Sequence, residues 1–578
     1  MTHAGRVVVP LCIALGAVQS LCAAELELSV EGVDGDLRGA ILSRLTLAQY
    51  EDRDVAPATI RYQFDNAEQE IREALEPFGY YAPDIDARLE EDGDAVHATF
   101  EVDAGEPVVV RSLNVTVASE AAELPAVAAA IESFEPDVGD RLDHGAYESS
   151  KSAIGSALRS AGYLDASLEQ HRVAVSIENR AADIDVVWEP GPRYEFGEVR
   201  FSDVQFPREF LVGYVPWEEG ESYSTTKLLE LQQRLTTTDY FQTVSVQPNL
   251  EERADGVIPV DVLLTENERN FYSAGLYYST DFGAGVRLEY ERRWLNDKGH
   301  TLATEIEYSQ RLQEYGLTYR IPRPGPQDRD FTFGFAYADE ESDTARSRSA
   351  RIAAAESRRR WRGFTRTLGL QYLRGDFEIG DDQRQSAVFY AEGTLSRRRL
   401  DDLTRPRNGY VADLGVRLAP SAFLSDTWLA QIWLGGGYLR SVGRNSRLIT
   451  RLDLGAMAVD DFDDLPPELR FFAGGDRSLR GFDYQAIGER DADGDVIGGE
   501  YLVTTSVEYE HFFDDNWGAA MFVDAGDAFT NDFEVNVSVG IGARWRSPVG
   551  VVRLDFAKPV VTDFEDGWRL HLTIGPTL

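Results

Sequence analysis

The stretch GGDRSLRGFDYQAIG, Gly474–Gly488, places one arginine among glycines and apolar side chains in what otherwise reads as a long loop. Arg480 stands between Leu479 and the pair Gly481 and Phe482. An exposed loop has no use for so much apolar surface. A loop folded back into a polar cavity would use it, and its arginine would be an anchor, because a guanidinium binds carboxylates through strong, often bidentate, hydrogen bonds.

Two carboxylates that could receive this arginine follow on consecutive predicted strands. In GGEYLVTTSVEYEHFF the apolar residues alternate so that Glu508 lies on the polar face, and in NWGAAMFVDAGDAF the same alternation puts Asp524 there. We therefore expect Arg480 to pair with one or both acids, Phe482 to pack against the surrounding wall, and Gly481 to relieve crowding. The alternative is an ordinary loop arginine and two unrelated acids.

The strands that carry these acids belong to a long alternating region that begins after Thr265. Segments such as AGVRLEYERRW, VNVSVGIGARW and WRLHLTIG alternate apolar and polar residues, the polar face is rich in small residues, and Trp or Tyr recurs near strand ends. Apolar-out, polar-in strands with interfacial aromatics are typical of a transmembrane β-barrel, whereas a soluble sandwich buries its apolar face. Residues 267–578 predict an all-β barrel of about 16 antiparallel strands at roughly 19 residues per strand and connection.

The start of the chain indicates export. Residues 1–24 combine Arg6, a short apolar core and small residues, the layout of a cleavable signal peptide. A lipoprotein reading at Cys22 is disfavoured because the large Leu21 precedes it. Cleavage after Ala24 removes both cysteines, Cys12 and Cys22, so the mature chain would have no disulfide or thiol chemistry.

Between the signal and the barrel, a pattern recurs three times. ALEPFGYYAPDIDARL, ALRSAGYLDASLEQHRV and RLTTTDYFQTVSVQPNL each predict an amphipathic helix that ends near Gly or Asp, then an aromatic residue and an alternating strand. We predict three α+β modules at residues 25–105, 106–190 and 191–266. The alternative is three unrelated α/β segments.

Both halves resemble known families. The β-α-α-β-β pattern resembles the periplasmic POTRA module, whose sheet edge accepts a further strand. The Arg-Gly-Phe loop at Arg480, the strand with Glu508 and the F-x-D-x-G strand with Asp524 resemble the signature of the BamA/TamA-type outer-membrane assembly superfamily. RPRNGYVADLGV and GIGARWRSPVGVVRLDFAKP are similar to its other barrel segments, and three modules resemble the TamA branch.

This resemblance implies a multi-pass outer-membrane protein with its modules in the periplasm. It would help insert or fold client β-barrel proteins such as autotransporters, bind a TamB-like inner-membrane-anchored partner, and take part in phospholipid transport, with outer-membrane lipid around it. It implies no cofactor, metal or enzymatic step. The alternatives are a two-partner secretion pore for an unfolded polypeptide and, from another class, an outer-membrane hydrolase.

Composition and motifs exclude some functions. The formal net charge of −42 disfavours binding of nucleic acid. Asp491, Asp493 and Asp495 suggest a calcium loop, but Leu502 stands where a bidentate Glu is needed, so we expect a tight acidic turn.

The end of the chain predicts a weak seam. Barrel closure pairs the first strand, near residues 271–280, with the last, near 568–576. Gly575 and Pro576 shorten the available ladder because Pro has no N–H to donate. We expect the barrel wall to open laterally at this seam; the alternative is that the strand ends by Ile574 and the wall stays shut.

Overall fold

The computed structural model describes residues 24–51, 53–92, 95–325, 328–343, 345–361, 363–379, 382–402, 405–421, 424–547, 550–562 and 567–574. The predicted signal peptide, apart from Ala24, lies outside them. The chain forms two compact units: the residues up to 197 with 219–227 and 250–258, and residues 198–218, 228–249 and 259 onward. No helix in the described part of the chain is long and apolar enough to cross a bilayer.

The first module is a four-stranded sheet packed against helices. Its elements are β1 (Ala24–Glu31), α1 (Gly35–Arg44), η1 (Thr46–Tyr50), β2 (Asp54–Val55), α2 (Pro57–Leu75), η2 (Glu76–Phe78), β3 (Asp84–Asp92) and β4 (Ala95–Asp103). The sheet order is β2-β1-β4-β3, with β1 parallel to β4. Ile60, Ala67 and Ile71, at helical spacing on α2, are fully buried against the sheet. The short β2 is an addition to the three strands expected from sequence.

The second module has the expected β-α-α-β-β order. It comprises β5 (Val109–Val117), η3 (Glu120–Glu123), α3 (Pro125–Glu132), α4 (His144–Ser160), β6 (Ser167–Ser176) and β7 (Ala181–Glu189), with sheet order β5-β7-β6. The Asp143 carboxylate caps α4 by accepting from the Ala146 N–H at 2.9 Å. Gly162, just past the end of α4, has φ 102°, a left-handed conformation that glycine adopts readily.

The third module leads directly into the barrel. It comprises β8 (Glu195–Phe201), α5 (Arg208–Val212), α6 (Thr225–Thr236), β9 (Phe241–Pro248) and β10 (Val257–Glu266), with sheet order β8-β10-β9. The Phe206 ring packs edge-on against Trp294, with ring centroids 6.1 Å apart. The Tyr240 hydroxyl donates to the Gly299 carbonyl at 2.5 Å. Because Trp294 and Gly299 lie between the second and third barrel strands, these contacts fasten the module to one rim of the barrel.

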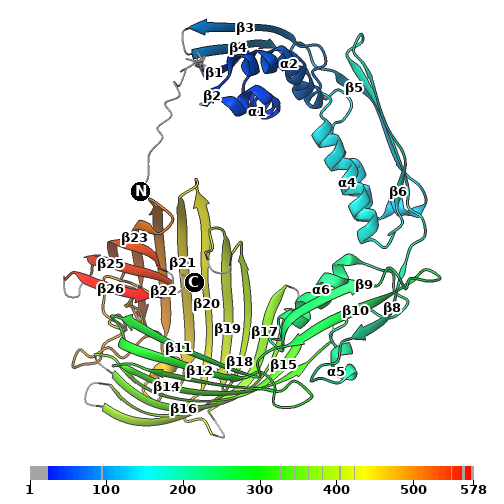
Figure 1. Cartoon of the computed structure of the whole chain (residues 1–578). Coiled ribbons are helices and arrows are strands. Elements are labelled where there is room, and N and C mark those ends of the chain that lie inside the picture. Colours follow the sequence, from blue (N-terminus) through cyan, green and yellow to red (C-terminus); the bar gives the residue numbers. More distant parts are fainter. Residues whose placement is uncertain are drawn as a thin grey trace, which may run out of the picture. The chain divides into compact units, whose positions relative to one another are not determined.

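The rest of the chain forms one 16-stranded antiparallel sheet whose strands follow chain order from β11 to β26. The strands are β11 (Asn270–Ser279), β12 (Gly283–Arg292), β13 (Thr301–Tyr308), β14 (Leu312–Arg323), β15 (Arg329–Glu341), β16 (Ala345–Trp361), β17 (Phe364–Ile379), β18 (Asp382–Leu400), β19 (Gly409–Ala419), β20 (Leu429–Val442), β21 (Ser446–Val459), β22 (Tyr501–Phe512), β23 (Trp517–Phe529), β24 (Asn536–Ser547), β25 (Gly550–Val561) and β26 (Arg569–Ile574). The sheet curls so that its two edge strands, β11 and β26, come close to each other (Figure 1). The predicted fold class, α+β modules followed by a 16-stranded barrel, is confirmed.

The predicted alternation determines which side chains face outward and which face the lumen. On β23, Met521 is 61% exposed on the outer face, while Asp524 of opposite parity is fully buried. The residues between β21 and β22 do not extend outward. They form a short turn η4 (Pro467–Leu469) and a coil that packs Leu479, Phe482 and Ile487 against Ala528 of the wall. We call residues 460–500 the inward loop.

Candidate functional site

Arg480 of the inward loop is buried in the lumen and makes a bidentate pair with Asp524. Its Nε donates to Asp524 Oδ2 at 2.9 Å and its Nη2 donates to Asp524 Oδ1 at 2.8 Å. Nη1 donates to Glu508 Oε2 at 2.7 Å. The guanidinium also lies over the Phe522 ring, with Cζ 3.3 Å from the ring centroid. The structure thus brings Arg480 together with both carboxylates that the sequence pattern singled out.

The two residues after Arg480 fit closely against the wall. The Gly481 N–H donates to the Ser538 hydroxyl at 3.1 Å. A Cβ on Gly481 would lie 2.4 Å from Ser538 Cβ, closer than real side chains approach, so only glycine fits here. The Phe482 side chain is 4% exposed, within the apolar cluster that joins the loop to the wall.

A second buried arginine, Arg544 on β24, also binds Glu508 and connects it to two further carboxylates. Its Nη2 donates to Glu508 Oε1 at 2.6 Å, its Nε to Glu510 Oε1 at 2.9 Å, and its Nη1 to Asp555 Oδ1 at 2.5 Å. Arg447 and Arg451 on β21 complete the cluster through Glu510 and Glu508. We define the lumenal ion cluster as Arg447, Arg451, Arg480, Arg544, Glu508, Glu510, Asp524 and Asp555.

The cluster as defined has four cations and four carboxylates, and all of them are largely buried. A buried charge is tolerated when it is paired and hydrogen-bonded, and removing one partner leaves an uncompensated charge. Glu510, Arg544 and Asp555 also belong to the cluster, although the Arg-Gly-Phe signature does not point to them. The parity that identified Glu508 also places Glu510 on the lumenal face, and the same test applied to VVRLDFAKP would have placed Asp555 there.

The inward loop also holds both edges of the sheet. Lumen-facing side chains of β26 all bind it: Arg569 Nη2 donates to Asp483 at 2.9 Å, His571 Nε2 bonds the Arg480 carbonyl at 2.7 Å, and the Thr573 hydroxyl donates to Asp476 at 3.4 Å. From β11, the Ser279 hydroxyl donates to that same Asp476 Oδ2 at 3.2 Å. One loop carboxylate therefore bridges the first and last strands.

A direct contact between the two edges is made by His571. Its Nδ1 lies 2.8 Å from the Thr280 hydroxyl, just past the end of β11. Because the Arg480 carbonyl only accepts, Nε2 carries the proton, and in the neutral ring Nδ1 accepts from Thr280. We call Ser279, Thr280, Asp476 and His571 the seam clasp.

Asp281, in the turn after β11, is a titrating group that contacts two residues of the seam clasp, and we include it in the clasp from here on. Its carboxylate accepts from the Asp476 N–H at 2.9 Å and lies 3.8 Å from His571 Nδ1. Burial, together with the neighbouring charge of Asp476, raises the pKa of the Asp281 carboxyl from 3.8 to about 7. The clasp therefore contains a carboxyl group that changes charge near neutral pH.

On the far side of the lumen, a second contact anchors the inward loop. The Tyr484 hydroxyl donates to Glu340 Oε1 on β15 at 2.8 Å, and the Tyr484 ring packs edge-on against Phe282. The loop thus extends from the ion cluster on β22–β25 to β15. Gly575 and Pro576, predicted to weaken the seam, lie outside the described residues.

Other predicted or excluded chemistry can be compared with the structure. The acidic stretch forms a tight turn in which Asp491 Oδ1 accepts from the N–H groups of Asp493 and Asp495. Among the described residues, no group of His, Asp or Glu is arranged to hold a metal ion. His571 is buried, and its two ring nitrogens bond Thr280 and the Arg480 carbonyl.

Three protein-family models match parts of this chain. A family model described as the Omp85 superfamily domain matches residues 264–577. The chain belongs to the Omp85 superfamily. A model described as POTRA domain TamA domain 1 matches residues 27–104, and a POTRA model described as surface antigen variable number repeat matches residues 194–267. The barrel therefore lies in the outer membrane, and the POTRA modules lie in the periplasm.

Two curated relatives are outer membrane protein assembly factors. The chain is 25% identical over 366 residues to outer membrane protein assembly factor BamA of Nitratidesulfovibrio vulgaris, covering 59% of this chain and 45% of the relative. It is 28% identical over 191 residues to BamA of Neorickettsia risticii, covering 30% of this chain and 25% of the relative. The chain thus spans less than half the length of these curated relatives.

A solved structure shows the same fold. The crystal structure of BamA from Haemophilus ducreyi lacking POTRA domains 1–3 superposes with a TM-score of 0.63 at 18% identity, covering 81% of this chain and 99% of that chain. At this level of identity the likeness concerns the fold, and the function must be argued from the site.

Proposed function

We propose that this Omp85 protein inserts or folds client β-barrel proteins, including autotransporters, through a lateral opening between β11 and β26. One observation carries the proposal. In the described residues β11 and β26 are the two edges of the sheet, and side chains of the seam clasp, rather than a backbone ladder, are what bridges them. Side-chain hydrogen bonds are broken one at a time, whereas a ladder must be broken along its length.

An open seam would expose backbone N–H and C=O groups at membrane depth. In hydrocarbon each such group costs several kcal/mol unless it is paired, so an incoming strand is a strongly favoured partner. A client strand would add to the free edge by β-augmentation. The described part of β26 has six residues, and over these residues a client would be released more easily than from a long ladder.

The inward loop disfavours the alternative of a secretion pore. That function requires a wide lumen, but the loop is held on one side by Arg480 and on the other by Tyr484. A hydrolase is disfavoured because a catalytic histidine must be accessible to substrate, whereas His571 is 4% exposed and is held between Thr280 and the Arg480 carbonyl.

Cross-linking the seam tests the proposal. A Ser279→Cys/Thr573→Cys variant, joined by a short thiol-reactive linker, would lock β11 to β26, because both side chains reach the same Asp476 oxygen. The matched control is Leu276→Cys/Val286→Cys, which joins β11 to its ladder neighbour β12 at facing positions. Folding of a small urea-unfolded outer-membrane barrel in liposomes that contain the protein is then followed by heat-modifiable gel mobility.

We expect the seam lock to stop client folding, the β11–β12 lock to leave it unchanged, and a cleavable linker to restore it on reduction. Client folding at the unlocked rate with a fully locked seam would refute the lateral route. The uncross-linked double variant shows how much activity the two substitutions themselves remove.

The match of residues 27–104 to a TamA-type POTRA model supports a finer proposal, that the POTRA modules dock a TamB-like inner-membrane-anchored partner. In the described residues the first module ends its sheet at β3, a nine-residue edge strand on which a partner strand would pair. Deleting residues 26–103 is expected to abolish capture of the partner and to leave a heat-modifiable barrel, since the module has its own core. Undiminished capture by the truncated protein would exclude the first module from partner binding.

A further inference from the structure

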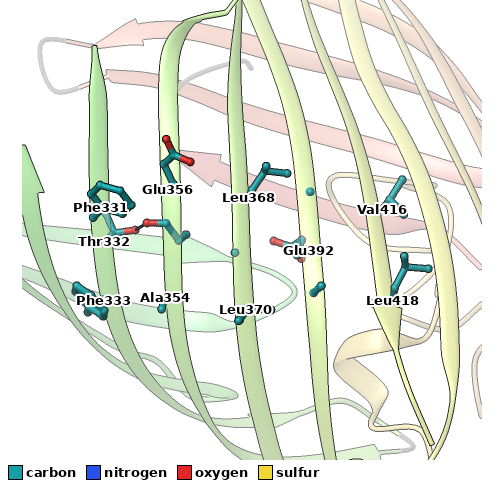
Figure 2. A pocket seen from close by; sticks show the side chains of 14 residues that line it. Phe331, Thr332, Phe333, Ala354, Glu356, Leu368, Leu370, Glu392, Val416 and Leu418 are labelled. Carbon is teal, nitrogen blue, oxygen red and sulfur yellow. Dashed lines mark hydrogen bonds between the residues drawn. The ribbon is translucent and has the colours of Figure 1, made fainter. Parts of the chain in front are cut away.

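A groove with an apolar lining runs over strands β15–β19 of the barrel, remote from the seam clasp. It has a volume of about 590 Å³. Figure 2 shows its lining at two levels, with Phe331, Glu356, Leu368 and Val416 at one and Phe333, Ala354, Leu370 and Leu418 at the other. Phe333, Leu370 and Leu418 are each about half exposed. On β15, Phe333 has the opposite parity to Glu340, which bonds the inward loop, and strand pairing puts Leu370 and Leu418 on the same face as Phe333, so these side chains face the membrane.

The groove arises from alternating large and small side chains on neighbouring strands. Pairing aligns one outward row across the five strands, which consists of Phe333, Ala354, Leu370, Ala391 and Leu418. The small residues on β16 and β18 therefore lie between large residues on β15, β17 and β19. This arrangement leaves a short trough over Ala354 on β16, bounded along the strand by Ile352 and Glu356, and another over Ala391 and Gly393 on β18. A trough of this kind fits a linear hydrocarbon chain better than a compact side chain.

The next row introduces a charge. It consists of Phe331, Glu356, Leu368, Gly393 and Val416, so a carboxylate stands on the outer face between two apolar side chains. The row after it brings three arginines side by side, since Arg329 faces Arg358 and Arg358 faces Arg366. Arg358 Nε donates to Glu356 Oε1 at 2.9 Å, while Arg329 and Arg366 are each 3.8 Å from that carboxylate.

A fourth outward arginine extends the cationic group. The Arg397 guanidinium lies over the Phe364 and Tyr410 rings, at 5.1 and 5.9 Å from their centroids. Arg329, Arg358 and Arg366 surround Glu356, and Arg397 lies two residues beyond Leu395, the pairing partner of Arg366. Four arginines to one glutamate give a net positive charge, and Glu356 holds Arg358 in position. We define Arg329, Arg358, Arg366 and Arg397 as the arginine group.

The arginine group lies at the periplasmic end of the groove. β15 begins at Arg329, next to the β14–β15 turn, where Arg234 of the third module donates to the Gly325 carbonyl at 3.4 Å. The modules are periplasmic, so this rim faces the periplasm. Arginines at that depth meet the phosphate groups of the inner leaflet of the outer membrane, where guanidinium groups form charge-assisted hydrogen bonds with phosphate oxygens.

We propose that the groove and the arginine group form a binding site for an anionic glycerophospholipid of the periplasmic leaflet. An acyl chain lies in the trough over β16 or β18, and the headgroup phosphate binds Arg358 and Arg366. The site selects its lipid through charge at one end and chain shape at the other, and so differs from general lipid contact around the barrel. It does not depend on the proposed insertion function.

Lipid retention by the full chain tests this site. The protein is reconstituted in nanodiscs of equal phosphatidylglycerol and phosphatidylethanolamine, extracted in detergent, and its retained lipids are quantified by mass spectrometry. Wild type is expected to retain phosphatidylglycerol in excess of phosphatidylethanolamine. Arg358→Gln/Arg366→Gln should reduce that retention by roughly thirtyfold, since each arginine near a lipid surface contributes about fivefold.

Two further variants separate the parts of the site. Ala354→Phe/Ala391→Phe fills both troughs and should reduce retention of both lipids. The control Arg346→Gln/Arg348→Gln removes two outward arginines at the other end of β16, which bind Asp339, and should change nothing. Heat-modifiable mobility shows that each variant is folded.

Three outcomes would overturn the proposal: equal retention of the two lipids by wild type, unchanged retention after Arg358→Gln/Arg366→Gln, or a control as impaired as that variant. Excess inorganic phosphate should fail to release the lipid, because the trough holds the chain. Full release by phosphate would reduce the site to an anion site and would also overturn the proposal.

Discussion

The far wall of the barrel and its seam cross the same membrane but are held together differently. On the far wall, β16, β17 and β18 are 17, 16 and 19 residues long and pair along nearly their whole lengths. At the seam, β26 has six residues, and β11 and β26 are linked through the inward loop. The wall derives its stability from the backbone, whereas the seam derives it from a few side chains. Substitution can therefore alter the seam without altering the wall.

The largest effect is expected from Arg480→Ala. The change leaves Asp524 and Glu508 as buried charges without their loop partner, at a local cost of about 3–5 kcal/mol. The backbone ladder is untouched, so the barrel should still insert, while the inward loop becomes sensitive to trypsin and client folding falls. The far-wall control is Arg346→Ala, which removes a half-exposed ion pair with Asp339 and should cost about 1 kcal/mol or less. Wild-type trypsin resistance of the loop in Arg480→Ala would contradict the prediction.

Asp524→Asn should reproduce much of this effect, because it removes the bidentate acceptor of Arg480. The double variant should be less damaging than the sum of the two single changes, since residues in direct contact couple. The measurement is the denaturant dependence of loop proteolysis in all four proteins. Simple additivity would show that the two residues do not interact.

The seam should also open more at higher pH, and the wall should not. The raised pKa of Asp281, about 7 instead of 3.8, means that the folded clasp binds the proton more tightly than the open state does. Clasp stability therefore falls as pH rises between these values and is lowest above about 7. Spin labels at Leu276→Cys and Leu570→Cys should show a larger separated population at about pH 8 than at about pH 5. Asp281→Asn should remove this dependence, and an unchanged dependence in that variant would assign it to another group.

Gly481→Ala should loosen the loop by a moderate amount. The new Cβ would meet Ser538 Cβ at 2.4 Å, and overpacking of this kind costs about 1–3 kcal/mol. Ser538→Gly should partly rescue the variant by removing the atom that clashes. Loop proteolysis reports both effects, and failure of the rescue would indicate that the Pro559 backbone is the main obstacle.

The smallest effect is expected from Tyr484→Phe, which removes the hydrogen bond to Glu340 and keeps the ring. A hydrogen bond to a charged group contributes about 1.5–3 kcal/mol, and Gln485 also approaches Glu340, so the lower end is expected. The loop should loosen on the β15 side while the seam distance between spin labels stays unchanged. A widened seam in this variant would show that the two anchors of the loop are coupled.

Local patterns predicted most of the fold and half of the site. Alternation within β22 and β23 was enough to place Glu508 and Asp524 in the lumen, because parity in a strand is a short-range property. The seam clasp could not be predicted in this way. Asp476 reaches Ser279 across almost 200 positions of the chain, and that contact depends on how the loop folds, which no strand period encodes. The alternation of WRLHLTIG is enough to put His571 on the polar face, yet its partners Thr280 and the Arg480 carbonyl carry no sequence signal.

The aromatic packing of the third module has a mechanical consequence. Phe206 against Trp294 and the bond from Tyr240 to Gly299 join the module to the connection between β12 and β13. A Cβ on Gly299 would collide with Phe210 and with the Tyr240 hydroxyl. The third module and the β12–β13 connection are therefore packed so closely that they can shift little against each other. A pull or twist applied to the module is therefore transmitted to the base of β12, one strand away from β11. Under the proposed lateral opening, a force applied to the module in the periplasm would reach the strand next to the edge strand β11 directly.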